Sequence, residues 1–569
     1  LAFRQMLEVP GLTAALVTPD RELGRRVAAE MRRWDVAVDD SAGTPLSATP
    51  PAALMILVAE AVTEGLSPAL LLGLLKHPYS SLGQDPSVTR RQARLLERIA
   101  LRGPRPAAGI GGLHQRLDTR AQDRFPPTDA DLSTARDLVG HLERALAPLL
   151  EAVQIDPVEP PAMLRALANA CEKVAATDTT PGNERLWAGE AGEALAGFVD
   201  ELAEAGATLP PVRPVDFAAL LKALMGGRAV RPRYGLHPRV AIFGPLEARL
   251  HHADLMILGG LNEGTWPPEP PVDPWMSRPM RKQFGLPAPE RRIGLSAHDF
   301  AQAFCAPQVL ITRSEKTGGS PTVPSRWLQK IETLLVGGLT DTEIDNTGWR
   351  DPTLRRWAML IDRPAHIRTC ARPVPKPPVA ARPRRLSVTQ IEKWLRDPYT
   401  IYARYVLGLK PLDPIDADPG AIDRGNILHA VFEAFIAAHD GQDLPPDAVA
   451  KLKALGRERF RILADSPGVA ALWWPRFERA AEAFVAVEAA RRHTIRQSFV
   501  EAEGQLTLQG PGGRFVLTGM ADRIDLLTDG TAEILDYKTG GPPTKAHVDT
   551  GFNPQLALEG LMLQRGGFD

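Results

Sequence analysis

The hydrophobic pattern near the start of the chain predicts a strand–helix–strand unit. A mainly apolar run at 14–18 is typical of a buried strand, and residues 21–33 follow with apolar positions at helical spacing. A second apolar run at 36–38 comes next and predicts a second strand. This pattern indicates an α/β fold.

The pattern changes between residues 51 and 230. This stretch is rich in Ala, Leu, Arg and Glu at helical spacing, with interruptions by Pro and Gly, and it predicts a mainly helical insertion. Short apolar runs at 240–243, 255–258 and 309–312 then predict three more buried strands. Residues 1–370 are therefore expected to form one α/β region interrupted by helices.

A proline-rich segment separates this region from the rest of the chain. Proline favours extended backbone and is excluded from helix interiors and central strands, so residues 371–385 are predicted to be a linker. Residues 386–569 then form a second domain, and Ser387 or Thr389 is expected to cap its first helix.

Composition is ordinary for a soluble protein, with 44% hydrophobic and 24% charged residues among 569. No run of about 20 apolar residues and no signal peptide is visible, so a cytoplasmic protein without a membrane span is expected. Widely separated cysteines suit that compartment and form no disulfide or metal-binding pattern: Cys171, Cys305 and Cys370. Because the chain begins at Leu1 and ends at Asp569, we expect it to be part of a longer protein.

The net charge of −1 means that any nucleic-acid surface must be local. The arginine-rich stretches Arg90–Arg124 and Arg278–Arg292 are candidates. Taken singly, each is more typical of a solvated helix face.

The strongest chemical signal lies in two segments near the C-terminus. Asp522 ends the sequence Gly-Met-Ala-Asp, and Asp536 and Lys538 follow an apolar run in Leu-Asp-Tyr-Lys. Two converging carboxylates can bind a hard divalent cation, and a lysine two residues after the second acid lies on the same strand face. There the lysine can orient or deprotonate a water that the metal activates, which is the chemistry of phosphodiester cleavage.

Turn geometry decides whether these acids converge. Thr528-Asp-Gly-Thr531 is a hairpin signal, and a two-residue loop there would place Asp522 opposite Tyr537. A three-residue loop, or a bulge, places Asp522 opposite Asp536 and pairs Ile524 with Ile534. Cross-strand matching favours this second register, whereas the alternative is a solvated hairpin with scattered charges.

Two helical segments frame the hairpin in sequence. His429 and Glu433 share one face of the first, although a lone histidine is more often structural than a ligand. Gln555 and Glu559 share one face of the second.

In this order, the motifs Arg-Gly-(x)3-His, Gly-x-x-Asp, Asp-Tyr-Lys-Thr-Gly and Gln-Leu resemble the RecB-type nuclease domain of the PD-(D/E)xK superfamily. The resemblance implies that His429, Asp522 and Asp536 bind Mg²⁺ or Mn²⁺, that Asp522, Asp536 and Lys538 are catalytic, and that Gln555 supports the site. Many members carry a tyrosine where this chain has Glu559.

The earlier region resembles a superfamily 1 helicase that has lost its catalysis. Gly260-Leu-Asn-Glu-Gly264 after the strand at 255–258 resembles motif V, and Pro289-Glu-Arg-Arg-Ile-Gly294 the start of motif VI. Phe300 then occupies the position of the arginine that contacts the γ-phosphate. No Gly-(x)4-Gly-Lys-Ser/Thr loop occurs in the chain.

An inactivated superfamily 1 helicase core with a helical insertion, followed by a PD-(D/E)xK domain with a mixed sheet flanked by helices, resembles the AddB family. This implies a Mg²⁺-dependent exonuclease in a heterodimer with an AddA-type helicase/nuclease subunit, acting on double- and single-stranded DNA ends in break repair. Some members hold an iron–sulfur cluster, which is not expected here because no cysteine follows residue 370.

Two alternatives compete with a nuclease subunit. One is a non-catalytic DNA-binding scaffold with a vestigial nuclease domain, against which Asp522, Asp536 and Lys538 argue. The other is an ATP-dependent helicase, against which Phe300 argues.

Overall fold

The structure is a computed structural model. It describes residues 1–122, 126–206, 208–231, 236–270, 272–349, 351–361, 363–439, 443–460, 467–538, 540–541 and 543–568. Arg124 and Thr539, which belong to motifs named above, lie outside these residues. The chain divides into two compact units, here called unit 1 (residues 1–63, 77–85 and 145–370) and unit 2 (residues 64–76, 86–144 and 371–569).

Unit 1 is built on a five-stranded parallel sheet in the order β2-β5-β1-β6-β7. Its strands are β1 (Ala14–Val17), β2 (Asp39–Asp40), β5 (Val240–Phe243), β6 (Leu255–Leu258) and β7 (Gln308–Ile311). The four strands predicted at 14–18, 240–243, 255–258 and 309–312 are therefore confirmed.

The strand predicted at 36–38 is wrong by position. Pairing with β5 begins at Asp39, while Val36 and Val38 pack into the core beneath the sheet. Burying a short apolar run is favourable in a loop as well as in a strand. Hydrophobicity therefore did not show which residues form the β-ladder with β5.

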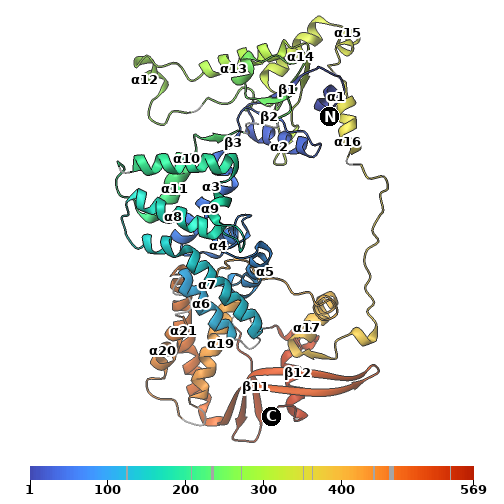
Figure 1. Cartoon of the computed structure of the whole chain (residues 1–569). Helices are drawn as coiled ribbons and strands as arrows, with labels where there is room; N and C mark the ends of the chain where they lie inside the picture. The colour runs from blue at the N-terminus through green and yellow to red at the C-terminus, as the bar shows by residue number, and fades with distance from the viewer. Residues whose placement is uncertain are drawn as a thin grey trace. The chain divides into compact units, whose positions relative to one another are not determined.

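Helices cover both faces of this sheet (Figure 1). One core includes Met31 of α2 (Arg21–Arg32), and Asp20 caps that helix by accepting from the amides of its first turn. The opposite core contains Phe300 of α13 (Arg291–Phe304) and Leu328 of α14 (Arg326–Gly338). The remaining elements around this sheet are α1 (Ala2–Leu7), η3 (Glu247–Leu250), α12 (Arg278–Gln283), β8 (Lys316–Thr317), β9 (Ser320–Pro321), α15 (Asp341–Asn346) and α16 (Thr353–Ile361).

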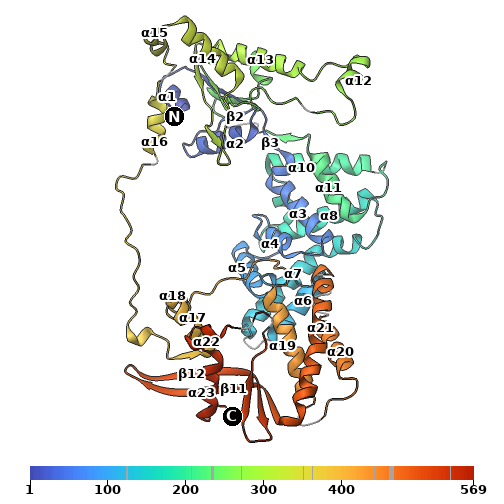
Figure 2. The same cartoon turned by 180° about the vertical axis from the view of Figure 1, so that it is seen from behind.

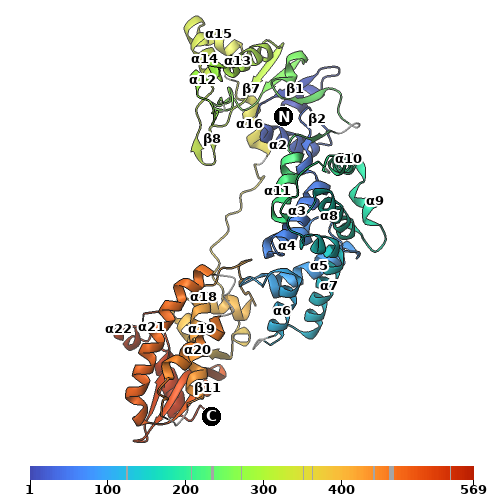
Figure 3. The same cartoon turned by 90° about the vertical axis from the view of Figure 1, so that its left-hand side faces the viewer.

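Between β3 (Thr44–Pro45) and β4 (Ala229–Val230), the described elements are helices. In unit 1, α3 (Pro50–Thr63) packs against α8 (Pro160–Ala175), α10 (Gly189–Gly206) and α11 (Pro214–Met225), as Figure 3 shows. The others are η1 (Leu46–Ala48), α4 (Pro68–Lys76), α5 (Pro86–Leu96), η2 (Glu97–Leu101), α6 (Gly109–Ala121), α7 (Asp129–Ala152) and α9 (Gly182–Leu186).

The C-terminal part of unit 2 contains a mixed sheet, as predicted. The long strand β12 (Gly513–Leu527) pairs with antiparallel β11 (Ile495–Gly510) along one edge. Along the other edge it pairs with parallel β10 (Arg385–Ser387) and then with antiparallel β13 (Ala532–Leu535).

The β12–β13 hairpin has the register that brings the two acids together. Ile524 pairs with Ile534, and the Leu527 amide donates to the Thr531 carbonyl at 2.8 Å, which closes a three-residue loop. Gly530, the last loop residue, has φ +85°, a conformation that glycine adopts without strain. The predicted three-residue loop is confirmed.

Helices pack on the sheet to position the site. The helices α19 (Ala421–Ala437), α20 (Ala448–Phe460) and α21 (Pro467–Arg491) share one apolar core, and α23 (Gln555–Gln564) packs near β12. Figure 2 shows α17 (Val388–Arg396), α18 (Pro398–Ile401) and α22 (Lys545–Asp549) beside this sheet. Unit 2 also contains the short 3-10 or π segments η4 (Val379–Ala381), η5 (Tyr402–Val406) and η7 (Arg492–Thr494).

Ser387 caps α17 through a reciprocal capping box with Gln390, so the predicted cap is Ser387 rather than Thr389.

Among the described residues, the structure contains no helix that is both long enough and apolar enough to span a bilayer.

Candidate functional site

Three side chains of kinds that can bind a metal converge from three elements of unit 2. His429 lies on α19, Glu501 on β11 and Asp522 on β12, and one ligand atom from each lies within 4.8 Å of the others. His429 Nδ1 is 3.5 Å from Asp522 Oδ2. All three side chains are half-buried, so they remain partly accessible to solvent.

The backbone of Tyr537 fixes two of these ligands. Its amide donates to Asp522 Oδ2 at 2.7 Å, and its carbonyl lies 2.8 Å from His429 Nε2. Because a carbonyl only accepts, Nε2 carries the proton, and Nδ1 is the nitrogen directed at the acids. A histidine that binds metal through one nitrogen commonly donates the other N–H in this way.

The electrostatics of this cluster favour the protonated imidazole of His429 and the ionised carboxylate of Asp522. The hydrogen bond to Asp522 raises the pKa of His429 above its ordinary value, although burial opposes the shift. Burial would raise the pKa of Asp522, but hydrogen bonds from His429 and the Tyr537 amide outweigh it, so the pKa is lowered. In the absence of a cation, the imidazole and the carboxylate therefore stabilise each other.

Asp536, Lys538 and Gln555 form a second group. Lys538 Nζ lies 2.9 and 2.6 Å from the two Asp536 carboxylate oxygens and donates to Gln555 Oε1 at 3.3 Å. Gln555 Nε2 in turn donates to Asp536 Oδ1 at 3.1 Å. The amide thus holds the acid and the lysine in fixed relation to each other.

The structure brings all five residues singled out from the sequence into one region, but in two groups. The tight ligand cluster holds His429 and Asp522, whereas the carboxylate of Asp536 is engaged by Lys538 and Gln555. Tyr537 joins the groups, since it follows Asp536 in the chain and its backbone is hydrogen-bonded to His429 and Asp522.

Glu501 was not anticipated from the sequence. It lies between the pairs Val500–Arg523 and Ala502–Ala521, which places it opposite Asp522, and its φ of +48° is unusual for a non-glycine residue in a strand. Counting back from a two-residue loop at Pro511-Gly512 would have given this pairing. The strand carries no motif that draws attention to it.

Glu559 lies in the buried interior behind Gln555. Its side chain is fully buried and accepts from Gln555 Nε2 at 3.3 Å, while Oε2 finds no hydrogen-bond donor among the described residues. Burial raises the pKa of Glu559 to about 7, and the nearby charges of Asp536 and Asp522 contribute to the shift. A neutral Glu559 at this position can receive the Gln555 amide without adding charge to the site.

A glycine allows α23 to approach the sheet closely. A β-carbon on Gly519 would lie only 3.2 Å from side-chain atoms of Met562, which is buried on α23. The Gly in Gly-x-x-Asp therefore lets the helix that carries Gln555 lie against the strand that carries Asp522.

The donor set suits a hard or borderline divalent cation. Glu501 and Asp522 offer carboxylate oxygens and His429 an imidazole nitrogen with its second N–H already bound. Carboxylates favour Mg²⁺ and Mn²⁺, and no thiol lies in the cluster to favour a softer metal. The residues therefore fit such a cation.

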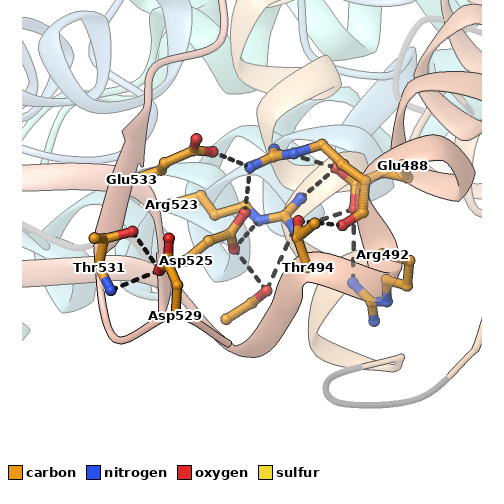
Figure 4. Close-up of polar contacts among 10 residues, drawn as sticks. Glu488, Arg492, Thr494, Arg523, Asp525, Asp529, Thr531 and Glu533 are labelled. Atoms are coloured by element: carbon orange, nitrogen blue, oxygen red, sulfur yellow. Dashed lines mark hydrogen bonds and ion pairs between the residues drawn. The ribbon is translucent and has the colours of Figure 1, made fainter. Parts of the chain in front are cut away.

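Behind the site, a buried charge network crosses the sheet (Figure 4). The fully buried Arg523 donates to Glu488 at 2.7 and 3.0 Å and to Asp525 Oδ1 at 2.6 Å. Burial alone would lower the pKa of Arg523, but these partners raise it above its ordinary value. The contributors at the edge of the network are Arg491, Arg492, Ser498 and Glu533.

The network also influences Tyr537. The Arg523 guanidinium favours the ionised form of the Tyr537 hydroxyl, but burial is the larger effect and leaves the pKa of that phenol raised. The Tyr537 ring packs on Phe432 and Phe484 at centroid distances of 5.5 and 5.9 Å. Arg523 and these rings thus support the residue whose backbone orients His429 and Asp522.

In unit 1, two aromatic residues of the helicase-like segments, Trp266 and Phe300, lie in the core. Phe300 is buried against Trp266 and Trp327, and Trp266 donates to the Gly259 carbonyl at 3.1 Å. Glu263 forms an ion pair with Arg326. These contacts give Phe300 a packing role.

Several arginines of the two arginine-rich stretches have acidic partners. Arg102 pairs with Glu97, and Arg278 pairs with Glu290 at 2.7 Å. The Arg278–Glu290 pair is exposed, as on a solvated face, whereas Arg102 pairs with a buried acid, Glu97.

Comparison with known proteins defines the class of the C-terminal domain. Residues 385–569 match the model of the PD-(D/E)XK nuclease superfamily, whose members are usually nucleases. This part of the chain is a PD-(D/E)XK superfamily domain, and the site described above lies within it.

Similar proteins include uncharacterized proteins of Rickettsia. One from Rickettsia felis is 27% identical over 396 residues, which are 68% of this chain and 44% of that protein. One from Rickettsia conorii is 27% identical over 67% of this chain and 44% of its own length. One from Rickettsia bellii is 27% identical over 68% and 45%. The chain therefore spans less than half the length of these relatives.

Proposed function

We propose that this chain is a metal-dependent DNA nuclease that hydrolyses phosphodiester bonds at the site around Asp522, Asp536 and Lys538. The observation that carries the proposal is the convergence of a candidate cation-binding cluster and an Asp–Lys–Gln group around the β12–β13 hairpin of a PD-(D/E)XK domain. A bound Mg²⁺ or Mn²⁺ would supply an activated water and stabilise charge on the phosphate.

The chain's own residues divide the remaining tasks. His429, Glu501 and Asp522 would hold the cation, with Asp536 as the additional ligand implied by the family resemblance. Lys538, whose side chain is 41% exposed, is accessible to substrate, and it would orient the attacking water or stabilise the developing negative charge. Gln555 would keep Asp536 and Lys538 in place.

Cleavage of an end-labelled linear DNA with Mg²⁺, Mn²⁺ or chelator tests this proposal. We expect cleavage with either metal and none with chelator. A protein that binds DNA but does not cut it with either metal would favour the competing scaffold function.

We further propose that the whole protein acts in an exonuclease complex that resects DNA breaks, beside an AddA-type motor subunit. Support comes from the parallel sheet of unit 1 and from its motif V-like and motif VI-like segments. Phe300, packed in the core, offers no charge to a γ-phosphate, so unit 1 would hold DNA without hydrolysing ATP. DNA-stimulated ATPase activity of this chain without a partner would contradict that role.

A further inference from the structure

The segment expected to be a simple linker is strongly basic and aromatic. Residues 371–407 contain eight Lys and Arg against two acids, whereas the whole chain has a net charge of −1. Both acids are engaged, since Glu392 pairs with Arg396 at 2.9 Å and Asp397 caps α18. The positive charge is therefore left for a partner of opposite sign.

This segment lines a groove in unit 2 of about 900 Å³. Its walls come from the proline-rich stretch, from α17 to η5, and from the β11–β12 turn, with Trp394, Tyr399, Tyr402, Phe515, Arg382 and Arg384 among the lining residues. Trp394 and Tyr399 are 48% and 56% exposed, and the Tyr399 and Tyr402 rings lie 5.8 Å apart. Exposed aromatic rings and two arginines thus line the same recess.

The groove is connected to the candidate active site. Helix α17 packs against α23, which begins at Gln555. Arg396 donates to the Phe552 carbonyl at 3.3 Å, and Asn553 donates to Glu392 at 3.5 Å. One helix therefore contributes Trp394 to the groove and braces the segment that leads into Gln555.

We propose that this groove is a stacking platform for the bases of a single DNA strand that leads to the nuclease site. The inference deepens the proposed nuclease function and rests on it. Exposed aromatic rings with nearby arginines bind unpaired bases and phosphates together, whereas a duplex keeps its bases stacked on one another. The excess positive charge favours a polyanion over an apolar protein segment.

The test is the affinity of the 569-residue chain for fluorescein-labelled oligo(dT), measured by anisotropy in chelator so that nothing is cut. Trp394→Ala should weaken binding roughly five- to hundredfold, the range for loss of one base–aromatic contact. Trp394→Phe, which keeps an aromatic ring at this position, should retain most of the wild-type affinity for oligo(dT). The matched control is Trp357→Ala, because Trp357 is a similarly exposed tryptophan (45%) in unit 1.

Two further probes separate stacking from other roles. For an abasic oligonucleotide, and likewise for a blunt duplex, the affinities of the wild-type chain and of Trp394→Ala should agree within twofold. Unchanged oligo(dT) affinity in Trp394→Ala would overturn the inference and leave the groove to a protein partner. An equal loss on the abasic strand would also overturn it.

The outcome is independent of catalysis. Oligo(dT) binding that depends on Trp394, in a chain that cuts no DNA with Mg²⁺ or Mn²⁺, would support the platform while defeating the nuclease proposal. Metal-dependent cleavage together with oligo(dT) binding that does not depend on Trp394 would support the nuclease proposal and defeat the platform.

Discussion

Replacing Arg523 with methionine should destabilise the C-terminal sheet more than any exposed substitution. Arg523 and Asp525 are fully buried, and Glu488 is 2% exposed. Removing the guanidinium breaks three hydrogen bonds of 2.6 to 3.0 Å and leaves two buried carboxylates with fewer partners.

The size of the destabilisation depends on which cations still pair with the two buried carboxylates after Arg523 is replaced. Loss of one partner of a buried ion pair costs about 3–5 kcal/mol. Arg491 still reaches Asp525 at 2.9 Å, and Arg492 lies 3.6 Å from Glu488, so we expect the lower part of that range. The double variant Arg523→Met with Glu488→Gln should recover part of the loss, because it removes one of the stranded charges.

The assay must be local, because a chain of two units does not give one unfolding free energy. Native-state hydrogen exchange of the β12 amides is suitable, and about 3 kcal/mol corresponds to roughly a hundredfold loss of protection. The amides of β1 in unit 1 are the internal control and should not change. Less than a threefold change in β12, or an equal change in β1, would refute the reasoning.

Three further predictions concern the site. Lys538→Ala should retain Mn²⁺ binding by calorimetry but lose about 10²–10³ in cleavage rate, and an equal fall in metal affinity would make Lys538 structural. Glu501→Gln should weaken Mn²⁺ binding at least tenfold with little effect on thermal stability, whereas unchanged affinity would remove Glu501 from the ligand set. Glu559 has a pKa of about 7 when folded and about 4.5 when unfolded, so its contribution to stability is present below pH 4.5 and lost as the pH rises through 7. In metal-free buffer, the stability of the Glu559→Gln variant should not show this decrease, which is worth up to about 3 kcal/mol. If the stability of wild type and variant depended on pH in the same way, Glu559 would not be a buried acid with a raised pKa.

The hairpin shows what the sequence could predict about this site. The Thr528-Asp-Gly turn and the Ile524–Ile534 match were sufficient to choose the register, because a one-residue slip would move every side chain to the other face. Glu501 was missed because no motif in its own strand marks it as a ligand, and because its place depends on the pairing of β11 with β12 and on a backbone with positive φ.

The proline-rich segment and the start of the chain show where local patterns mislead. Proline indicated extended backbone at 371–385 but did not reveal that part of this segment would line a groove with Trp394. Apolar residues at 36–38 indicated burial, which is correct for Val38, but the ladder to β5 begins at Asp39. Burial and strand pairing are separate properties, and hydrophobicity reports the first.

The proposed nuclease function is tested most directly by measuring the cleavage of linear DNA by the Asp536→Ala variant. Asp536 contacts both Lys538 and Gln555, so its loss should disrupt the metal-dependent reaction. We predict that Mg²⁺-dependent cleavage falls at least about a hundredfold, while DNA affinity in chelator and thermal stability are retained. The control Asp549→Asn, an exposed acid on α22, should cut at the wild-type rate. Cleavage by Asp536→Ala near the wild-type rate would contradict the account.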